Sequence, residues 1–310
     1  MNSYTKSSTA EDVTEGLDLS GQVALVTGCT AGIGLETMRV LALRGAHVLG
    51  TGRTIEKAQK ACGGMPGKLT QLELELTDLD SVNRCATAIS SLGLTPNIVI
   101  CNAGMMPFGD LELVSGIEKV FFANFLGHFV LVNNLLPSML KKGSGRFVHV
   151  SSDSAYKKDS SKQVSSIGID FLNLRGEGNF NPGEIYAQSK LANALFSLEL
   201  SHRLKGTGLT SNALHPGSIL TNITHSAPAS VRKQVEEWAH RLRTPEQGAA
   251  TQVYVATSPD LRDVSGGFFE KCNPTIVPQP HFLDDKAMAE KLWDVAEEMA
   301  GRHLSPPDTA

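Results

Sequence analysis

Short apolar runs alternate with helix-length segments between about residue 18 and residue 272 of this chain. The runs are rich in β-branched residues and are bounded by Gly, Asn, Ser or Pro, as buried parallel strands are. They are Val23–Val26, His47–Thr51, Leu72–Leu76, Ile98–Cys101, Phe147–Val150 and Thr210–Leu214, with Gly266–Phe269 as a candidate edge strand. Apolar residues repeat at helical spacing over Ile33–Leu43, Ser81–Ile89, Val114–Leu140, Tyr186–Leu204 and Pro245–Ala256. This alternation predicts an α/β fold: a single-domain, doubly wound parallel sheet of about seven strands with helices on both faces.

The pattern changes at both ends of this region and in two long insertions. Residues 1–17 are predicted to be a flexible polar tail, residues 18–272 the single domain, and residues 273–310 an extension with one helix. The insertions, residues 153–185 and 218–244, have the length of loops that cover active sites. In the second, apolar residues at helical spacing predict an amphipathic lid, with an ordinary surface helix as the alternative; they are Val231, Val235, Trp238 and Leu242.

Composition and charge exclude several classes of protein. The 310 residues are 41% hydrophobic and 19% charged, which excludes disorder, and a net charge of −4 disfavours nucleic-acid binding. Five cysteines without a C-x-x-C pair indicate a reducing cytoplasm, and nine histidines without a close ligand pair predict no metal site. The most apolar stretch, Val120–Leu140, contains costly polar residues, so we expect a buried helix and no membrane anchor.

A glycine-rich turn follows the first predicted strand. The sequence Thr27 to Gly34 reads TGCTAGIG and leads into a helix. Glycines there let the backbone turn sharply and approach a pyrophosphate at a helix N-terminus, as in a Rossmann fold. A turn that serves only helix packing is the alternative, because the glycine spacing is wider than in the commonest dinucleotide fingerprint.

A tyrosine and a lysine are spaced for acid/base chemistry. Tyr186 is the only one of four tyrosines with a lysine four residues later, Lys190, and one helical turn places both on the same face. A nearby ammonium is expected to lower the pKa of a phenol from about 10. Tyr186 would then exchange a proton with a substrate oxygen.

Further motifs occur in a fixed order along the chain. After the glycine turn come Asn102-Ala103-Gly104, Asn124, Ser151-Ser152, the Tyr186/Lys190 pair and Pro216-Gly217. With these the sequence resembles the short-chain dehydrogenase/reductase family over nearly all of residues 18–272. The segments NFLGHF at 124–129, SKLAN at 189–193 and TPEQGA at 244–249 are similar to its retinol dehydrogenase and WW-domain oxidoreductase group. The chain shows neither a WW module nor a membrane anchor, so substrate and location do not carry over.

The resemblance implies roles for the catalytic residues. Tyr186 is the acid/base and Ser152 hydrogen-bonds the substrate oxygen; Ser152 is chosen over Ser151 as the second serine, with Ser154 as a weaker rival. Asn124 would hold a water that links Lys190 to solvent, the alternative being a buried helix asparagine bonded to backbone. His128 is predicted to be a satisfied core histidine rather than a base.

The resemblance also implies a set of coenzyme contacts. They are Gly28, Thr30, Gly32, Ile33, Gly34, Arg53, Glu75, Asn102, Tyr186, Lys190, Pro216, Gly217 and Thr221. Glu75 stands where the family usually has Asp, and Asp78 is its rival. The second strand ends in Gly-Thr-Gly and then Arg53, without a carboxylate to bind a ribose 2′-hydroxyl, so NADP(H) is favoured over NAD(H). The alternative for Arg53 is a solvated surface charge.

These observations predict an oxidoreductase. It would transfer a hydride between NADP(H) and a lipophilic secondary alcohol or ketone that is retinoid-, steroid- or polyketide-like. Residues 105–108, Met-Met-Pro-Phe, would supply an apolar wall. An NAD-linked enzyme of the same family and a non-catalytic dinucleotide sensor or scaffold are the alternatives. Val114–Leu140 and Tyr186–Leu204 resemble the surfaces through which the family dimerises, which implies a homo-oligomer.

Overall fold

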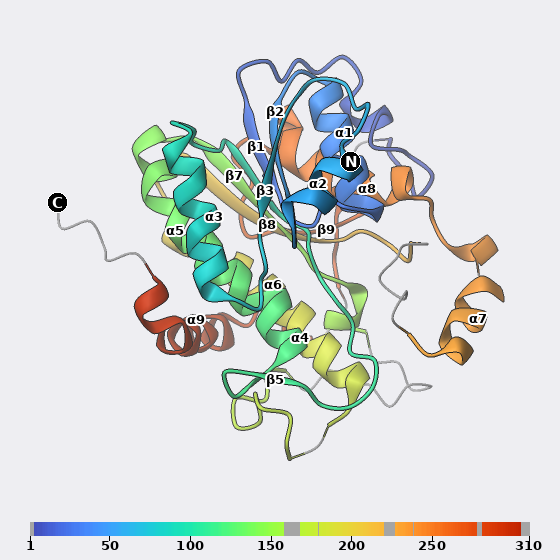
Figure 1. The fold of residues 1–310 in the computed structure, drawn as a ribbon, viewed down its shortest axis with the longest axis vertical. Coiled ribbons are helices and arrows are strands. Elements are labelled where there is room, and N and C mark those ends of the chain that lie inside the picture. Colours follow the sequence, from blue (N-terminus) through green and yellow to red (C-terminus); the bar gives the residue numbers. More distant parts are fainter. Residues whose placement is uncertain are drawn as a thin grey trace.

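A central sheet with helices on both faces forms the body of the protein (Figure 1). The computed structural model describes residues 3–157, 168–178, 180–219, 227–237, 239–277 and 281–304. The sheet has eight strands in the order β10-β9-β8-β7-β4-β1-β2-β3. Neighbouring strands are parallel except β10, which pairs with β9 in the antiparallel sense. The chain is therefore a doubly wound α/β fold.

The strands lie close to the predicted apolar runs. They are β1 Val23–Val26, β2 His47–Gly52, β3 Lys68–Glu73, β4 Ile98–Cys101, β7 Gly145–Val150, β8 Leu209–His215, β9 Phe268–Glu270 and β10 Asn273–Pro274. The third was wrongly predicted to cover Leu72–Leu76. Leu74 and Leu76 are buried in the loop after β3, and Leu76 lies against Gly127. Their burial extends the apolar pattern of the sequence beyond the end of the strand.

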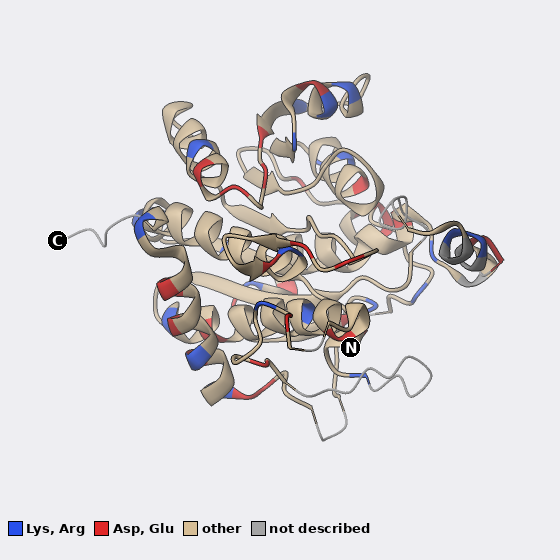
Figure 2. Ribbon diagram, turned by 60° about the horizontal axis from the view of Figure 1, so that its bottom comes forward, with Lys and Arg blue, Asp and Glu red and all other residues tan. Residues whose placement is uncertain are grey.

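The two faces of the sheet bury different sets of helices. Side chains alternate along β1, so that Leu25 joins the core under α3, α5 and α6, while Ala24 and Val26 join the core under α1 and α8. The helices are α1 Gly32–Leu43, α2 Ile55–Ala61, α3 Leu79–Ser91, α5 Gly127–Lys142, α6 Pro182–Arg203, α7 Ala229–Glu237, α8 Pro245–Thr257 and α9 Lys286–Ala300. Charged residues of both signs are interspersed on these helices, around a sheet with few of them (Figure 2).

The segment predicted as one helix over Val114–Leu140 consists of several elements. A two-residue hairpin, β5 Leu113–Val114 and β6 Ile117–Glu118, precedes a short α4, Lys119–Phe121, because Ser115 and Gly116 adopt positive φ and reverse the chain. A π-helical turn, Phe122–Leu126, then leads into α5. By length and composition Lys119–Lys142 is apolar enough to cross a membrane, but 78% of its apolar window is buried inside the fold. It is placed as a core helix.

Both predicted terminal regions are packed on the domain over their described parts. Residues 12–14 form a 3-10 turn with Val13 buried, and Ala10 N donates a hydrogen bond to Glu246 O (2.9 Å). Tyr4 also stacks edge-on against Tyr254, so the described part of the predicted flexible tail contacts the domain. The physical reason is that a few apolar residues in a polar stretch suffice to dock it.

The C-terminal helix α9 covers α5 and α6. Trp293 lies edge-on against Phe129, with ring centroids 5.0 Å apart. The guanidinium of Arg203 lies over the Trp293 ring, with Cζ 4.0 Å from the ring centroid. Trp293 is 4% exposed. A homo-oligomer built through α5 and α6 would therefore have to include or displace α9, which occupies part of that surface (Figure 1).

A helix is present where the lid was predicted. It is α7, which stands away from the sheet (Figure 1). Trp238 and the side chains of Val231 and Val235 lie outside the described residues, and Leu242 is half-buried. The choice between a lid and a surface helix stays a prediction.

Candidate active site

Parallel strands bring most of the predicted site residues to one edge of the sheet. Gly28 follows β1, Arg53 follows β2, Asn102 follows β4, Ser152 follows β7 and Pro216 follows β8. All of these are carboxyl ends, which is where ligands bind in open α/β sheets. Glu75 comes two residues after β3, at the same edge. Thr221 lies outside the described residues.

The glycine turn leaves no space for side chains. A Cβ on Gly34 would lie 2.3 Å from the carbonyl oxygen of Gly28, and one on Gly28 would lie 2.9 Å from Cβ of Ala103. Gly28 and Gly32 also have positive φ (71° and 59°). Ile33 and Gly34 open α1, whose N-terminal N–H groups suit a phosphate. These residues fit a dinucleotide pyrophosphate, and Thr30 is exposed beside them.

Asn102 braces the turn from β4. Its Nδ2 donates to the carbonyl oxygen of Thr27 (2.7 Å), and the backbone N–H groups of Asn102 and Ala103 both donate to Thr27 Oγ1 (2.9 Å each). Asn102 therefore has a structural role in addition to any coenzyme contact. It fixes the glycine turn to the neighbouring strand.

The adenosine end of the predicted site is more open. Arg53 is exposed at the end of β2, and Thr54 caps α2, the short helix that the sequence patterns did not predict. Glu75 accepts hydrogen bonds from the N–H and hydroxyl of Thr77 at Oε1, so that oxygen is turned toward its own loop. Asp78, its rival, caps α3. A coenzyme contact from Glu75 stays a prediction.

Lys190 is deeply buried beside the carboxyl end of β7. Asn181 caps α6, whose first turns carry Tyr186 and Lys190. Lys190 is 3% exposed, its Nζ donates to the carbonyl oxygen of Val150 (3.1 Å), and it lies 5.7 Å from the centroid of the Tyr186 ring. The spacing therefore brings the ammonium and the ring together, as predicted from the sequence.

The direction of the tyrosine pKa shift is opposite to the expectation. Burial raises the pKa of Tyr186 to about 12; a hydrogen bond with the Ser152 side chain lowers it and the charge of Asp153 raises it. Burial also lowers the pKa of Lys190 to about 8. The expected lowering of the phenol pKa by Lys190 is therefore not seen, and loss of solvation is the largest influence on this pKa.

The two serines after β7 point to different partners. Ser151 Oγ donates to the carbonyl oxygen of Lys190 (2.6 Å) and is thereby committed to α6. Ser152 Oγ lies 3.3 Å from Asp153 Oδ1, accepts from Ser154 N and contacts Tyr186. This arrangement favours Ser152 as the residue that faces a substrate oxygen.

Asn124 is fully buried in the π-helical turn. Its Oδ1 accepts from Met105 N (2.8 Å), and its Nδ2 donates to Met105 O and Ser189 Oγ (3.0 Å each). These bonds match the alternative interpretation, in which Asn124 is a buried helix asparagine bonded to neighbouring backbone. A water held by Asn124 stays a prediction.

A cluster of charged residues beside Ser152 was missed. Asp153 N donates to His215 Nδ1 (3.0 Å), and Lys157 Nζ donates to Asp153 Oδ2 (2.8 Å). Burial acts to raise the pKa of Asp153, but His215 and Lys157 together hold it below the usual range. Tyr156 donates from its hydroxyl to Glu270 nearby. Sequence position could have revealed this cluster, because Asp153 directly follows Ser152 and His215 directly precedes Pro216.

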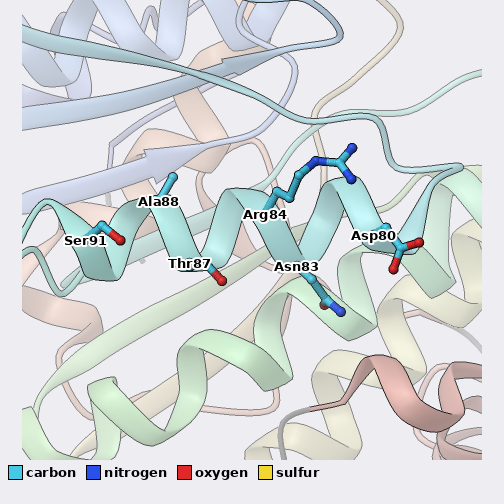
Figure 3. A pocket seen from close by; sticks show the side chains of 6 residues that line it. All are labelled: Asp80, Asn83, Arg84, Thr87, Ala88 and Ser91. Atoms are coloured by element: carbon cyan, nitrogen blue, oxygen red, sulfur yellow. The ribbon is translucent and has the colours of Figure 1, made fainter.

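Two surface hollows lie elsewhere. One runs along α3 and is lined by side chains of that single helix, polar except for Ala88, as Figure 3 shows. A larger groove lies between the start of α3, the β5–β6 hairpin, residues 171–175 and α9. Neither contains Ser152, Tyr186 or Lys190.

The fold and this edge define a dinucleotide-dependent oxidoreductase, and comparison with known proteins identifies its family. The family model for short chain dehydrogenases matches residues 22–165. The chain is 37% identical to Short-chain dehydrogenase TIC 32 A, chloroplastic, of Brassica napus, a match that covers 94% of this chain and 92% of that protein. It belongs to the short-chain dehydrogenase/reductase family and is an NAD(P)-dependent oxidoreductase acting on CH–OH groups.

Other relatives place the chain near one group of the family. It is 34% identical to Retinol dehydrogenase 14 of Mus musculus, covering 91% of this chain and 87% of that protein. It is 32% identical to the WW domain-containing oxidoreductase of Danio rerio, covering 98% of this chain and 74% of that protein. The resemblance to this group is thereby confirmed.

Solved structures show the same fold. A crystal structure of an uncharacterized protein from Mycobacterium Paratuberculosis matches with a TM-score of 0.72 and 29% identity, over 95% of this chain and 98% of that one. A Beutenbergia cavernae protein, described as an NAD(P) dependent gluconate 5-dehydrogenase, matches with a TM-score of 0.64 and 27% identity over 81% of this chain and 95% of that one; it has bound NADP at low occupancy.

Proposed function

We propose that the protein is an NADP(H)-dependent reductase of lipophilic ketones, with Tyr186 as the acid/base. The observation that carries this proposal is the convergence of Tyr186, Lys190 and Ser152 where β7 and α6 meet, next to the glycine turn. A sensor or scaffold without catalysis would not require these three groups together. The reverse reaction, oxidation of a secondary alcohol, uses the same residues.

The chain's own residues supply a proton path. A bound nicotinamide would supply or accept the hydride. Tyr186, whose pKa burial raises to about 12, keeps its proton at neutral pH and so donates it to the carbonyl oxygen during reduction. Ser152 Oγ donates a hydrogen bond to the same oxygen, and Lys190, protonated below its pKa of about 8, stabilises the phenolate that forms. At neutral pH these protonation states supply a proton donor for reduction.

The preference for NADP(H) rests on the end of β2. A Cβ on Gly52 would lie 2.7 Å from Cγ2 of Thr30, so the strand ends without a side chain there and without a carboxylate. Arg53 is exposed immediately afterward, where a guanidinium would bind a ribose 2′-phosphate. The bound NADP in the similar Beutenbergia cavernae structure supports the proposal. An NAD-linked enzyme of the same family is the second candidate.

The substrate class rests on the apolar segment that follows β4. Residues 105–108 follow β4 and are half-buried, and Met105 is held to Asn124 through both of its backbone polar groups. Methionines adapt to bulky apolar guests. The relative named retinol dehydrogenase acts on a lipophilic alcohol, which supports the same class here. Cytoplasm is the proposed location, since all five cysteines are free thiols.

Steady-state turnover with a panel of ketones tests this function. Ketones of increasing apolar size are assayed with NADPH and with NADH, alongside Tyr186→Phe as the catalytically disabled variant. We expect NADPH-linked turnover that improves with apolar size and is abolished in the variant. Equal turnover with both coenzymes would support the NAD-linked candidate. Dinucleotide binding without turnover of any ketone or alcohol would leave the sensor as the function.

A further inference from the structure

His128 in the first turn of α5 is buried and bonded at both ring nitrogens. It is 1% exposed, with Nε2 2.9 Å from Thr27 Oγ1 and Nδ1 2.9 Å from the carbonyl oxygen of Asn124. Thr27 directly precedes the glycine turn, and Asn124 lies in the π-helical turn. His128 thus bonds to its own helical segment and to Thr27, which lies 101 positions earlier in the chain.

The partners determine where the proton is. The carbonyl oxygen of Asn124 only accepts, so Nδ1 of His128 donates to it. Thr27 Oγ1 already accepts from the N–H groups of Asn102 and Ala103, so its own proton is directed to Nε2. Burial, the largest cause, and the charge of Lys190 lower the pKa of His128 to about 4, although the hydrogen bond to Asn124 acts to raise it, so the ring is neutral. His149 is the other titratable group coupled to it among the described residues.

The same hydrogen bonds continue to the catalytic helix. Asn124 Nδ2 donates to Ser189 Oγ (3.0 Å), and Ser189 Oγ donates to the carbonyl oxygen of Tyr186 (2.8 Å). An unbroken chain of contacts therefore runs from Thr27 through His128, Asn124 and Ser189 to Tyr186. Every link is a directional bond between buried or half-buried groups, which have few alternative partners.

We propose that His128 is a positioning residue, which through its Nδ1 bond to Asn124 holds the π-helical turn that supports Ser189 and the start of α6. The proposal rests on the assignment of Tyr186 as the acid/base. Loss of the Nδ1 bond to Asn124 releases the turn that supports Ser189 and Tyr186. Loss of the Nε2 bond alone leaves Thr27 with two backbone partners. The Nδ1 bond is therefore the one that matters for proton transfer.

Two substitutions separate the two bonds. His128→Asn places an amide N–H near the Nδ1 position and so keeps the bond to Asn124, whereas His128→Leu removes both bonds. We expect kcat of His128→Leu to fall roughly 10- to 100-fold, as a small displacement of a reacting group can cause, while the Kd for coenzyme changes less than about threefold. We expect His128→Asn to restore most of kcat.

His149→Phe is the matched control. His149 is also a buried histidine, its Nε2 has no partner in the described part of the chain, and its ring packs against Phe196. Its substitution should leave both kcat and the Kd for coenzyme unchanged, once any loss of thermal stability has been taken into account. A His128→Leu variant that keeps full kcat, or a His128→Asn variant that is as impaired as His128→Leu, would overturn the proposal.

A spectroscopic measurement on the wild-type chain is independent of activity. Two-bond ¹H–¹⁵N correlation spectra should show His128 as the neutral Nδ1–H tautomer, which is the less common form in water. An Nε2–H tautomer or a charged ring would overturn the hydrogen-bond chain whatever the reaction is. If the spectra and coenzyme binding are as expected but Tyr186→Phe is fully active, the proposed function fails and the positioning role fails with it.

Discussion

Lys190 Nζ donates a hydrogen bond to the carbonyl oxygen of Val150, which ties the buried ammonium on α6 to the last residue of β7. Ser151 returns a bond from the strand end to the carbonyl oxygen of Lys190. This reciprocal pair fixes the helix that carries Tyr186 against the strand that leads to Ser152. The placement of Tyr186 beside Ser152 therefore depends on a junction between two elements.

Tyr186→Phe should abolish turnover and leave coenzyme affinity nearly intact. The ring still packs, but it has no proton to exchange, a loss of roughly 100-fold or more. Single-turnover kinetics and coenzyme titration measure the two effects. Tyr254→Phe, in α8 and 6% exposed, is the matched control and should be active. Activity of Tyr186→Phe within threefold of wild type would contradict the assignment.

Arg53→Ala should weaken NADP(H) binding selectively. The lost charge-assisted bond to a 2′-phosphate is worth about 1.5–3 kcal/mol, a rise in Kd of roughly 10- to 150-fold, while NAD(H) affinity stays the same. Arg84→Ala, an exposed arginine on α3 that pairs with Asp78, is the control. Equal weakening of both dinucleotides would make Arg53 a structural residue.

The rate of ketone reduction should fall as the pH rises through about 8. Lys190 loses its charge there, so the phenolate of Tyr186 is no longer stabilised, while Tyr186 itself keeps its proton to about pH 12. A pH profile of kcat measures this fall, which forms the alkaline limb of the profile. Lys190→Arg should move the limb to higher pH if the larger side chain is accommodated, since a guanidinium stays charged. A profile that is flat from pH 7 to pH 10 would count against the role of Lys190.

The same residue should impose a stability cost that disappears at high pH. The folded-state pKa of Lys190, about 8, is below its ordinary value of 10.5, so the unfolded chain binds more protons between these values. Its contribution to the free energy of unfolding therefore rises from about pH 8 to pH 10.5. Lys190→Met should be more stable than wild type at pH 7, with the difference shrinking above pH 8. Urea unfolding at several pH values tests it, and a constant difference would contradict the cause.

Trp293→Ala should destabilise the protein by about 3–5 kcal/mol, the cost of removing a large buried aromatic. Its ring contacts Phe129 of α5 and Phe196 of α6, so both helices would lose a buried aromatic contact with α9. Urea unfolding measures the loss, and sedimentation shows whether the uncovered face associates. Asp294→Ala, exposed on the same helix, is the control. A change below about 1 kcal/mol would mean that α9 is only loosely attached.

Local pattern was sufficient for the parts of this protein that depend on neighbours in the chain. Buried strands need runs of apolar residues, sharp turns need glycine, and one helical turn brings Tyr186 and Lys190 together, so the fold class, the glycine turn from Gly28 to Gly34 and the proximity of these two side chains were predictable. The register of β3 was not, since Leu74 and Leu76 are buried without being in the strand.

Only the tertiary structure decided what depends on solvation and on distant contacts. The pKa of Tyr186 rises because of burial, a property of the whole packed site that its spacing from Lys190 does not contain. The partners of His128 come from β1 and the π-helical turn, and the cover on α5 and α6 comes from α9, far along the chain. Hydrogen-bond direction and desolvation are set by three-dimensional surroundings, which explains why sequence spacing could not supply them.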